Sequence, residues 1–146
     1  MQKIFFLIFM LSVYSICIGY SQIEKILGKW VAIDDNNPTT KSIIQIYKDN
    51  NDKYYGKVIK IFGNQNVICE KCKGENKNKP ILGLTVISDM KLKDCTLTGG
   101  TILDPTKGDI YYCSIGYDKK TDRLRIRGSL DKRGWFGRTQ YWERSY

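Results

Sequence analysis

The sequence has no histidine among its 146 residues. A Ser-His-Asp triad, a Cys-His catalytic pair, a histidine-ligated metal centre and a histidine pH switch are therefore all excluded. Proline is also scarce, with three residues, and beyond residue 21 no long apolar stripe recurs at helical spacing. Parallel α/β folds are excluded as well, because their parallel strands need crossover connections that are usually helices.

Acidic residues are outnumbered by basic ones, 15 against 24, which gives a formal net charge of +9. Much of this charge lies in residues 119–146, with nine basic and three acidic residues, and in residues 70–79, with four and two. Such an excess favours anionic partners, although it also simply keeps a protein soluble. The hydrophobic content of 42% and the aromatic content of 12% are typical of one folded globular domain.

The first 21 residues have the pattern of a secretory signal peptide. A positively charged start is followed by an apolar run from Ile4 to Ile18, and small residues precede Gln22. The run is shorter than the ~20 residues that a membrane-spanning helix needs. A lipoprotein cleavage site at Cys17 is disfavoured because no small residue precedes it. We therefore expect cleavage near residue 21, a secreted or periplasmic protein, and one domain over residues 22–146.

The domain is predicted to consist of strands joined by short turns. Segments rich in Ile, Val, Tyr and Thr alternate with Asp, Asn, Gly and Pro clusters, which favour chain reversal. About eight such strands favour a closed antiparallel barrel or a sandwich, and a barrel has no exposed strand edges. The single helical signal is a weak capping-box spacing from Ser21 to Glu24. The expected strands are Gly28–Asp34, Lys41–Lys48, Lys53–Phe62, Leu82–Ser88, Gly100–Leu103, Ile110–Tyr117, Arg123–Ser129 and Gly137–Arg144.

Two segments near the ends of the domain resemble lipocalin-like barrels. These are Gly28-Lys29-Trp30 on the first predicted strand and the run from Gly137 to Trp142 on the last. The resemblance implies that an arginine of the last strand, Arg138, stacks on Trp30 and closes one end of the barrel. Such a stack is physically favourable, since a guanidinium is attracted to the face of an indole ring.

Six ordered segments of the domain carry a more specific resemblance: residues 26–30 with 34–35, 55–59, 78–84, 99–105 with 108–111, 124–128 and 137–142. On these segments the whole domain resembles the bacterial domain-of-unknown-function family 2147. This resemblance implies an exported, small, lipocalin-like β-barrel and no established activity. The sequence departs from the family pattern at residues 94–98, which lack the aromatic residue usually found before Gly99-Gly100. If that aromatic residue lines a ligand site in relatives, the ligand of this protein differs or is absent.

Four cysteines follow the predicted leader: Cys69, Cys72, Cys95 and Cys113. An even number in an exported protein favours disulfides, and we prefer the pairing Cys69–Cys72 with Cys95–Cys113. Thioredoxin-like chemistry at the C-x-x-C is disfavoured because no helix is predicted there. A four-cysteine metal site is disfavoured because the second pair is not closely spaced. No cofactor or metal is expected.

Tyrosine and basic residues on the predicted strands are the candidates for binding a ligand. Inward-pointing Tyr and Arg side chains would make an amphipathic pocket for a small amphipathic or anionic molecule in a barrel of about eight strands. Two alternatives remain open: the rings fill the barrel as core, and the arginines form a solvated outer stripe if Leu124 and Ile126 face inward. The ligand-binding candidates are Tyr55, Lys57, Tyr111, Arg125 and Arg127.

No residue constellation indicates catalysis. Asp34 and the adjacent Asp35 would point to opposite faces of a strand, and Asp104 begins a turn that its side chain can cap. We expect structural roles for both groups, with Asp109 the remaining carboxylate nearby. The predicted function is the binding of a small amphipathic or anionic ligand or an envelope component. The alternative is a basic surface that binds an anionic envelope polymer or membrane headgroups, with no internal ligand; no nucleic-acid partner is expected, and oligomeric state stays open.

Overall fold

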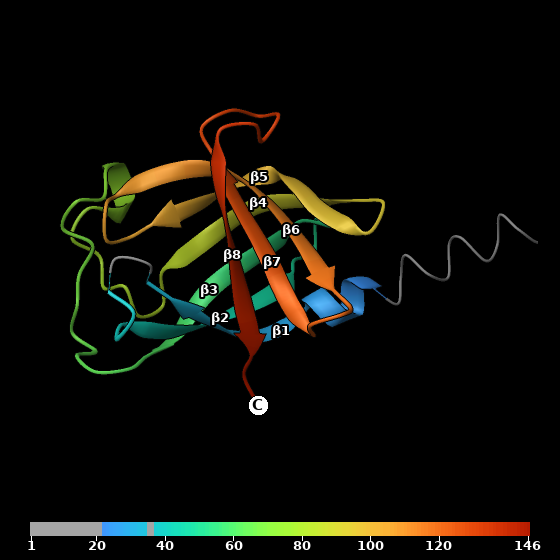
Figure 1. The fold of residues 1–146 in the computed structure, drawn as a ribbon. Coiled ribbons are helices and arrows are strands. Elements are labelled where there is room, and N and C mark those ends of the chain that lie inside the picture. The colour runs from blue at the N-terminus through green and yellow to red at the C-terminus, as the bar shows by residue number, and fades with distance from the viewer. Residues whose placement is uncertain (1–21, 35–36) are drawn as a thin grey trace, which may run out of the picture.

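The structure is a computed structural model that describes residues 22–34 and 37–146, so the predicted signal peptide and Asp35 lie outside the described residues. Within them, a short helix at residues 22–26 is followed by strands that each pair antiparallel with the next, and β8 returns to pair with β1 (Figure 1). The predicted antiparallel barrel is confirmed. Its strands are β1 (Gly28–Ile33), β2 (Lys41–Lys48), β3 (Tyr54–Ile61), β4 (Thr85–Lys93), β5 (Thr96–Asp104), β6 (Asp109–Asp118), β7 (Arg123–Ser129) and β8 (Gly137–Arg144).

The alternating strand directions give the barrel two different ends. The helix, the β2–β3, β4–β5 and β6–β7 turns and the C-terminus lie at what we call the closed end. The β1–β2, β3–β4, β5–β6 and β7–β8 connections lie at the other end, which we call the open end. The β3–β4 connection is the longest of them and contains a 3-10 turn, η1 (Gly74–Asn76), within the Lys-rich loop that the sequence predicts.

Aspartate side chains hold the predicted turns by accepting backbone N–H groups. The Asp49 carboxylate accepts from the backbone nitrogens of Asn51 and Lys53, both at 2.9 Å. Asp104 likewise accepts from the nitrogens of Thr106 and Lys107, at 2.9 and 3.2 Å. The predicted role of Asp104 as the cap of its own turn is confirmed, because a short acceptor can satisfy N–H groups that a tight turn leaves without strand partners.

The β4–β5 hairpin is longer than the sequence predicts. Strand β4 continues to Lys93 and β5 begins at Thr96, whereas the expected strands leave residues 89–99 unassigned. The chain reverses within Asp94 and Cys95, and Asp94 adopts a positive φ of 55°. A turn without glycine or proline has a weak sequence signal, but aspartate tolerates this conformation better than most residues.

The interior near the closed end is filled with side chains. Alternate residues of the strands point inward, and Tyr54 packs into this core with 4% of its surface exposed, while the partly buried Tyr117 packs against it. The alternative that rings fill the barrel therefore holds for Tyr54. Burying each large apolar side chain contributes roughly 1.5–3 kcal/mol. The core near this end includes Trp30, Ile46, Ile87, Met90, Leu97, Ile115, Leu124 and Trp142.

Arg144, and not Arg138, closes the barrel over Trp30. The Arg144 guanidinium carbon lies 4.2 Å from the centre of the Trp30 ring, and the guanidinium also donates to the carbonyl oxygens of Lys25 and Leu27. The correction follows from register: β8 pairs with β1 only near its C-terminal end, where Arg144 lies opposite Trp30. Gly28 fits this corner because its φ is +120° and a Cβ there would lie 3.1 Å from the guanidinium.

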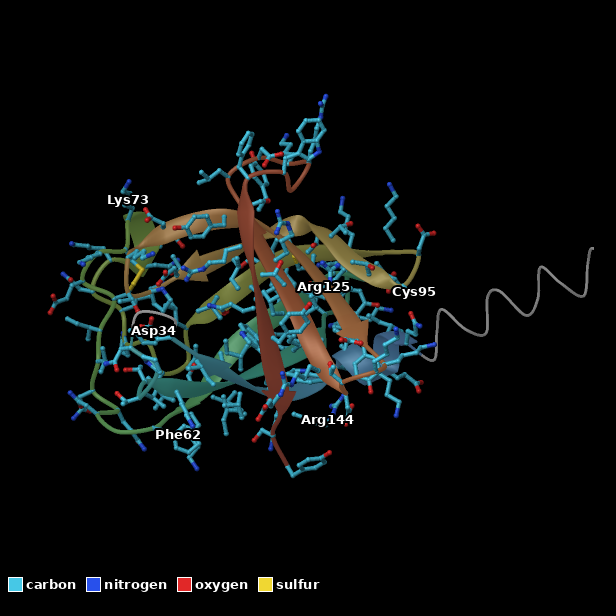
Figure 2. The ribbon with its side chains drawn as sticks, viewed as in Figure 1. Asp34, Phe62, Lys73, Cys95, Arg125 and Arg144 are labelled. Atoms are coloured by element: carbon cyan, nitrogen blue, oxygen red, sulfur yellow. A yellow bond between two sulfur atoms is a disulfide. The ribbon has the colours of Figure 1, made fainter. Side chains whose placement is uncertain are left out.

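Of the four cysteines that the structure describes, Cys69 and Cys72 form a disulfide, with their Cα atoms 5.3 Å apart, and Cys95 and Cys113 are free. The preferred Cys95–Cys113 pair is wrong. Cys113 lies opposite Gly100 on β5, five residues beyond Cys95, which is roughly 16 Å along a strand. A disulfide needs Cα atoms within about 7 Å. Figure 2 shows the disulfide and Cys95 at opposite ends of the barrel.

Candidate functional site

Strand alternation separates the predicted ligand-binding residues into two groups. On β7, Leu124 and Ile126 are buried inside the barrel, so Arg125 and Arg127 point outward. The predicted outer stripe of arginines is therefore confirmed, and an interior role for these two residues is wrong. The register of β7 places the stripe on the same outer surface as the β7–β8 connection.

The residues predicted on β3 also face outward. Tyr54 and Val58 are buried inside, and Tyr55 and Lys57 alternate with them, so the interpretation of Tyr55 and Lys57 as interior ligand contacts is wrong. On the outer face, the Tyr55 ring stacks on Tyr47 with the ring centres 6.0 Å apart.

An exposed carboxylate ties β3 to β4 beside this ring pair. The Tyr55 hydroxyl donates to Asp89 at 3.1 Å, and the Lys53 ammonium lies 2.9 Å from the same carboxylate. The hydrogen bond from Lys53, and after it the one from Tyr55, lowers the pKa of Asp89 below its usual value. Tyr55 is thus a structural residue of the outer sheet surface.

Two of the outer arginines are engaged in structural contacts. Arg127 donates from Nε to the carbonyl oxygen of Gly134 at 2.9 Å and from Nη1 to the Thr139 hydroxyl at 3.2 Å. Arg123 pairs with Glu143 across β7 and β8 at 3.2 Å. The stripe is therefore part of the scaffold that holds β8 and the β7–β8 connection.

Tyr111 is the predicted ligand-binding residue that points into the barrel. It alternates with Cys113 and Ile115, which are both buried inside. A Cβ built on Gly128, which faces inward on β7, would lie 3.6 Å from the Tyr111 Cβ. Because Tyr111 is near the start of β6, its ring lies toward the open end, beyond the packed core.

Two further inward residues lie on β8: sequence reasoning missed Gln140 and gave Arg138 the role of barrel closure. Gln140 lies opposite the buried Ile126 and Arg138 lies opposite Gly128, so both share the interior face. The Gln140 side-chain oxygen accepts from the Trp142 indole nitrogen at 3.1 Å. The alternation of Trp142, Gln140 and Arg138 along one strand was the signal that could have identified them.

Two carboxylates lie on the same face of the β5–β6 hairpin. Asp104 and Asp109 are opposite each other in register, two residues from the inward pair Ile102 and Tyr111. The Tyr111 hydroxyl lies 3.4 Å from Asp109. Burial, and then the charges of Asp109 and Asp104, raise the pKa of Tyr111, and the positive charge of Arg138 opposes that rise. The tyrosine thus stays a neutral hydroxyl that can donate or accept.

These residues form what we call the mouth: Asp104, Asp109, Tyr111, Arg138 and Gln140. Toward the closed end the same inward face carries the apolar Ile126 and Trp142, and Ile102 lies opposite Tyr111; we call these three residues the floor. Such an arrangement suits an amphipathic molecule whose apolar part contacts the floor and whose polar part reaches hydrogen-bonding groups of both charge signs. Beside the mouth, Asp34 accepts from the Thr106 hydroxyl at 3.1 Å and so ties β1 to the β5–β6 turn.

The segment that departs from the family pattern is distant from the mouth. Residues 94–98 form the β4–β5 turn and the start of β5 at the closed end, and Leu97 there is fully buried opposite Ile115. An aromatic residue in this segment would not line the mouth, so its absence leaves the mouth unchanged.

Cys69 and Cys72 are paired in the disulfide, and both side chains are buried. Within residues 22–34 and 37–146, no group of three or more His, Cys, Asp or Glu side chains is placed to hold a metal ion. In the same part of the chain, no helix has the length and apolar character needed to cross a bilayer.

Comparison with known proteins supports the architecture. A family described as "Uncharacterized protein conserved in bacteria" (DUF2147) matches residues 28–144. Among solved structures, the chain is similar to protein HP1028 from the human pathogen Helicobacter pylori, which is described as belonging to the lipocalin family. That likeness has a TM-score of 0.70 at 21% identity and covers 82% of each chain, so it shows the fold alone. No match is found among curated proteins.

Proposed function

Because this chain belongs to the DUF2147 family of uncharacterized bacterial proteins and folds as a lipocalin-like barrel, we propose that it binds a small amphipathic molecule at the mouth. The single observation that carries the proposal is that the inward-facing side chains of β5, β6 and β8 change from apolar to polar toward the open end. Apolar side chains fill the closed end, whereas the inward residues of β5, β6 and β8 at the open end are polar. On the β3 side of the open end, Ile61 and Leu84 remain apolar and buried. Some of the polar groups have partners within the mouth or its floor, and together they place hydrogen-bonding groups beside apolar ones, which is the character of a small-molecule site.

The charges of the mouth refine the class of ligand. Asp104 and Asp109 contribute two carboxylates against the one guanidinium of Arg138. Arg125 and Arg127 point outward, so their positive charges do not contribute to the mouth. A neutral or zwitterionic amphipathic molecule therefore fits the mouth better than an anion, because an anion would be repelled by the carboxylates.

We further propose that residues 1–21 direct export and are removed near Gln22. The apolar run of the leader and the disulfide between Cys69 and Cys72 both support an oxidising compartment such as the periplasm or the medium. Intact-mass measurement of the protein recovered from its own host tests this. A mass that includes residues 1–21 would refute it.

Native mass spectrometry of the same preparation tests the binding proposal. We expect a retained small molecule, and we expect Tyr111→Phe with Arg138→Ala to weaken its binding at least about tenfold through lost hydrogen bonds. The matched control is Tyr55→Phe with Arg125→Ala, which changes the same residue types on the outer surface and should retain the ligand. Equal loss in both variants, or a wild-type protein that carries no small molecule, would refute the proposal.

The alternative function, binding of an anionic polymer by the arginine stripe, has less support. Arg123 and Arg127 are engaged with Glu143, Thr139 and the β7–β8 connection. Replacing Arg125, the remaining arginine of the stripe, with serine tests whether the stripe binds such a polymer. Salt-sensitive polysaccharide binding that the substitution abolishes would favour the alternative over the mouth.

A further inference from the structure

The β7–β8 connection, residues 130–136, exposes large apolar side chains. Leu130, Trp135 and Phe136 are 74%, 72% and 71% exposed. The other two tryptophans, Trp30 and Trp142, are buried in the core. Figure 1 shows this connection projecting beyond the barrel between the ends of β7 and β8. We call residues 130–136 the apolar loop.

The apolar loop has a defined conformation. The Asp131 carboxylate accepts the backbone N–H groups of Phe136 at 2.8 Å and Trp135 at 3.2 Å, and the backbone nitrogen of Leu130 donates to the Phe136 carbonyl oxygen at 2.8 Å. Arg127 adds hydrogen bonds to the carbonyl oxygens of Gly134 and Trp135. Because these contacts order the loop in advance, little conformational entropy is lost when its side chains meet a partner.

Basic residues accompany the exposed apolar ones. Lys132 and Arg133 lie at the centre of the loop, and the Arg133 guanidinium carbon is 5.7 Å from the centre of the Trp135 ring. The carboxylate of Asp131 is directed to the backbone nitrogens of its own loop. Tryptophan beside apolar and cationic side chains is the combination that suits the boundary between lipid headgroups and acyl chains.

We propose that the apolar loop docks the protein on a phospholipid bilayer that contains anionic headgroups. Leu130, Trp135 and Phe136 enter the acyl boundary, and Lys132 and Arg133 bind lipid phosphates. This surface is separate from the mouth residues, and the proposal does not rest on the proposed ligand.

The size and shape of the apolar loop favour a bilayer over a protein partner. Three large side chains at a projecting tip offer on the order of 500 Å² of contact area, below the roughly 800 Å² per partner of a stable protein interface. A bilayer needs no matching shape and supplies the negative charge that complements Lys132, Arg133 and the net positive charge of the chain. Since the loop lies at the open end, docking brings the mouth close to the lipid surface.

Sedimentation with vesicles tests the proposal. The protein is expressed from its complete coding sequence, and its N-terminus is determined by mass measurement. We expect binding to phosphatidylcholine vesicles that contain phosphatidylglycerol, with a blue shift and quenching by brominated lipid of the Trp135 fluorescence. Trp135→Ser with Phe136→Ser should weaken binding at least about tenfold. Lys132→Ser with Arg133→Ser should reduce the preference for phosphatidylglycerol. Every variant carries the same N-terminus, so an apolar leader cannot cause a difference between them.

Phe62→Ser is the matched control. Like Trp135, Phe62 is an exposed aromatic residue at the open end with a cation beside it, because the Lys60 ammonium lies 4.8 Å from its ring centre. Phe62 lies on a different side of the barrel from the apolar loop (Figure 2). Its replacement should leave vesicle binding unchanged. Wild-type protein that stays in solution with anionic vesicles overturns the proposal, as does binding without a Trp135 shift. A dimer in sedimentation that the Trp135 and Phe136 substitutions dissolve also overturns it, because the loop would then bind a second copy.

Discussion

Replacing Arg144 with alanine should lower the free energy of unfolding by about 3 kcal/mol. The substitution removes a stack over the buried Trp30 ring and two hydrogen bonds, to the carbonyl oxygens of Lys25 and Leu27. A partly desolvated cation–π contact is worth about 2 kcal/mol, and hydrogen bonds from a charged donor add roughly 1 kcal/mol or more. For a domain of this size the melting temperature should fall by about 10 °C.

Urea denaturation followed by tryptophan fluorescence measures this loss, and Arg138→Ala is the matched control. Arg138 lies on the same inward face of β8 but at the exposed, open end and away from Trp30, so its replacement should cost clearly less than that of Arg144. Arg144→Lys should recover only part of the loss, because an ammonium lacks the planar fork that stacks on the ring and reaches both carbonyl groups. If Arg138→Ala costs as much as Arg144→Ala, the assignment of Arg144 as the closing residue is wrong.

Three further predictions concern other described residues. Burial raises the pKa of the Cys113 thiol from 9.0 to about 12. The thiol therefore loses its proton at a lower pH in the unfolded chain than in the folded protein, and the free energy of unfolding should fall as pH rises from about 9 to 12. The slope from this thiol is up to about 1.4 kcal/mol per pH unit, and it should be absent from a Cys113→Ala variant in parallel urea titrations. In native protein, a thiol reagent should label Cys95 rapidly and Cys113 only on unfolding; equal labelling rates would contradict the packing. Gly108→Ala should destabilise by several kcal/mol, because its φ is +74° and a Cβ would lie 2.0 Å from the Lys71 carbonyl oxygen, and an unchanged melting temperature would count against that contact.

Local sequence signals predicted much of the barrel. The boundaries of β2, β7 and β8 agree with the expected strands because alternating residues and well-marked turns are short-range features. The Cys69–Cys72 disulfide was predictable for the same reason, since the two residues are three apart. The β4–β5 hairpin was missed because its turn at Asp94 has no glycine or proline.

The candidate site was predicted less well. Residue type indicated Tyr55, Lys57 and Arg125, but an aromatic or basic residue on a strand gives no information about a ligand until its face is known. Tyr111 was correctly expected to be able to face inward, whereas Arg138 was given a structural role that belongs to Arg144. The exposure of Trp135 could not be predicted either, because tryptophan is usually buried.

The sequence by itself determined that this protein has no imidazole chemistry, carries a strong positive charge and forms an antiparallel β domain with short turns. These properties depend on composition and on contacts between near neighbours. The tertiary structure decided which arginine meets Trp30, which faces of β3, β6 and β7 look inward, and that three apolar side chains of residues 130–136 stay in solvent. Those outcomes depend on the register with which β8 closes on β1 and on pairing between distant strands, and no local pattern encodes such register.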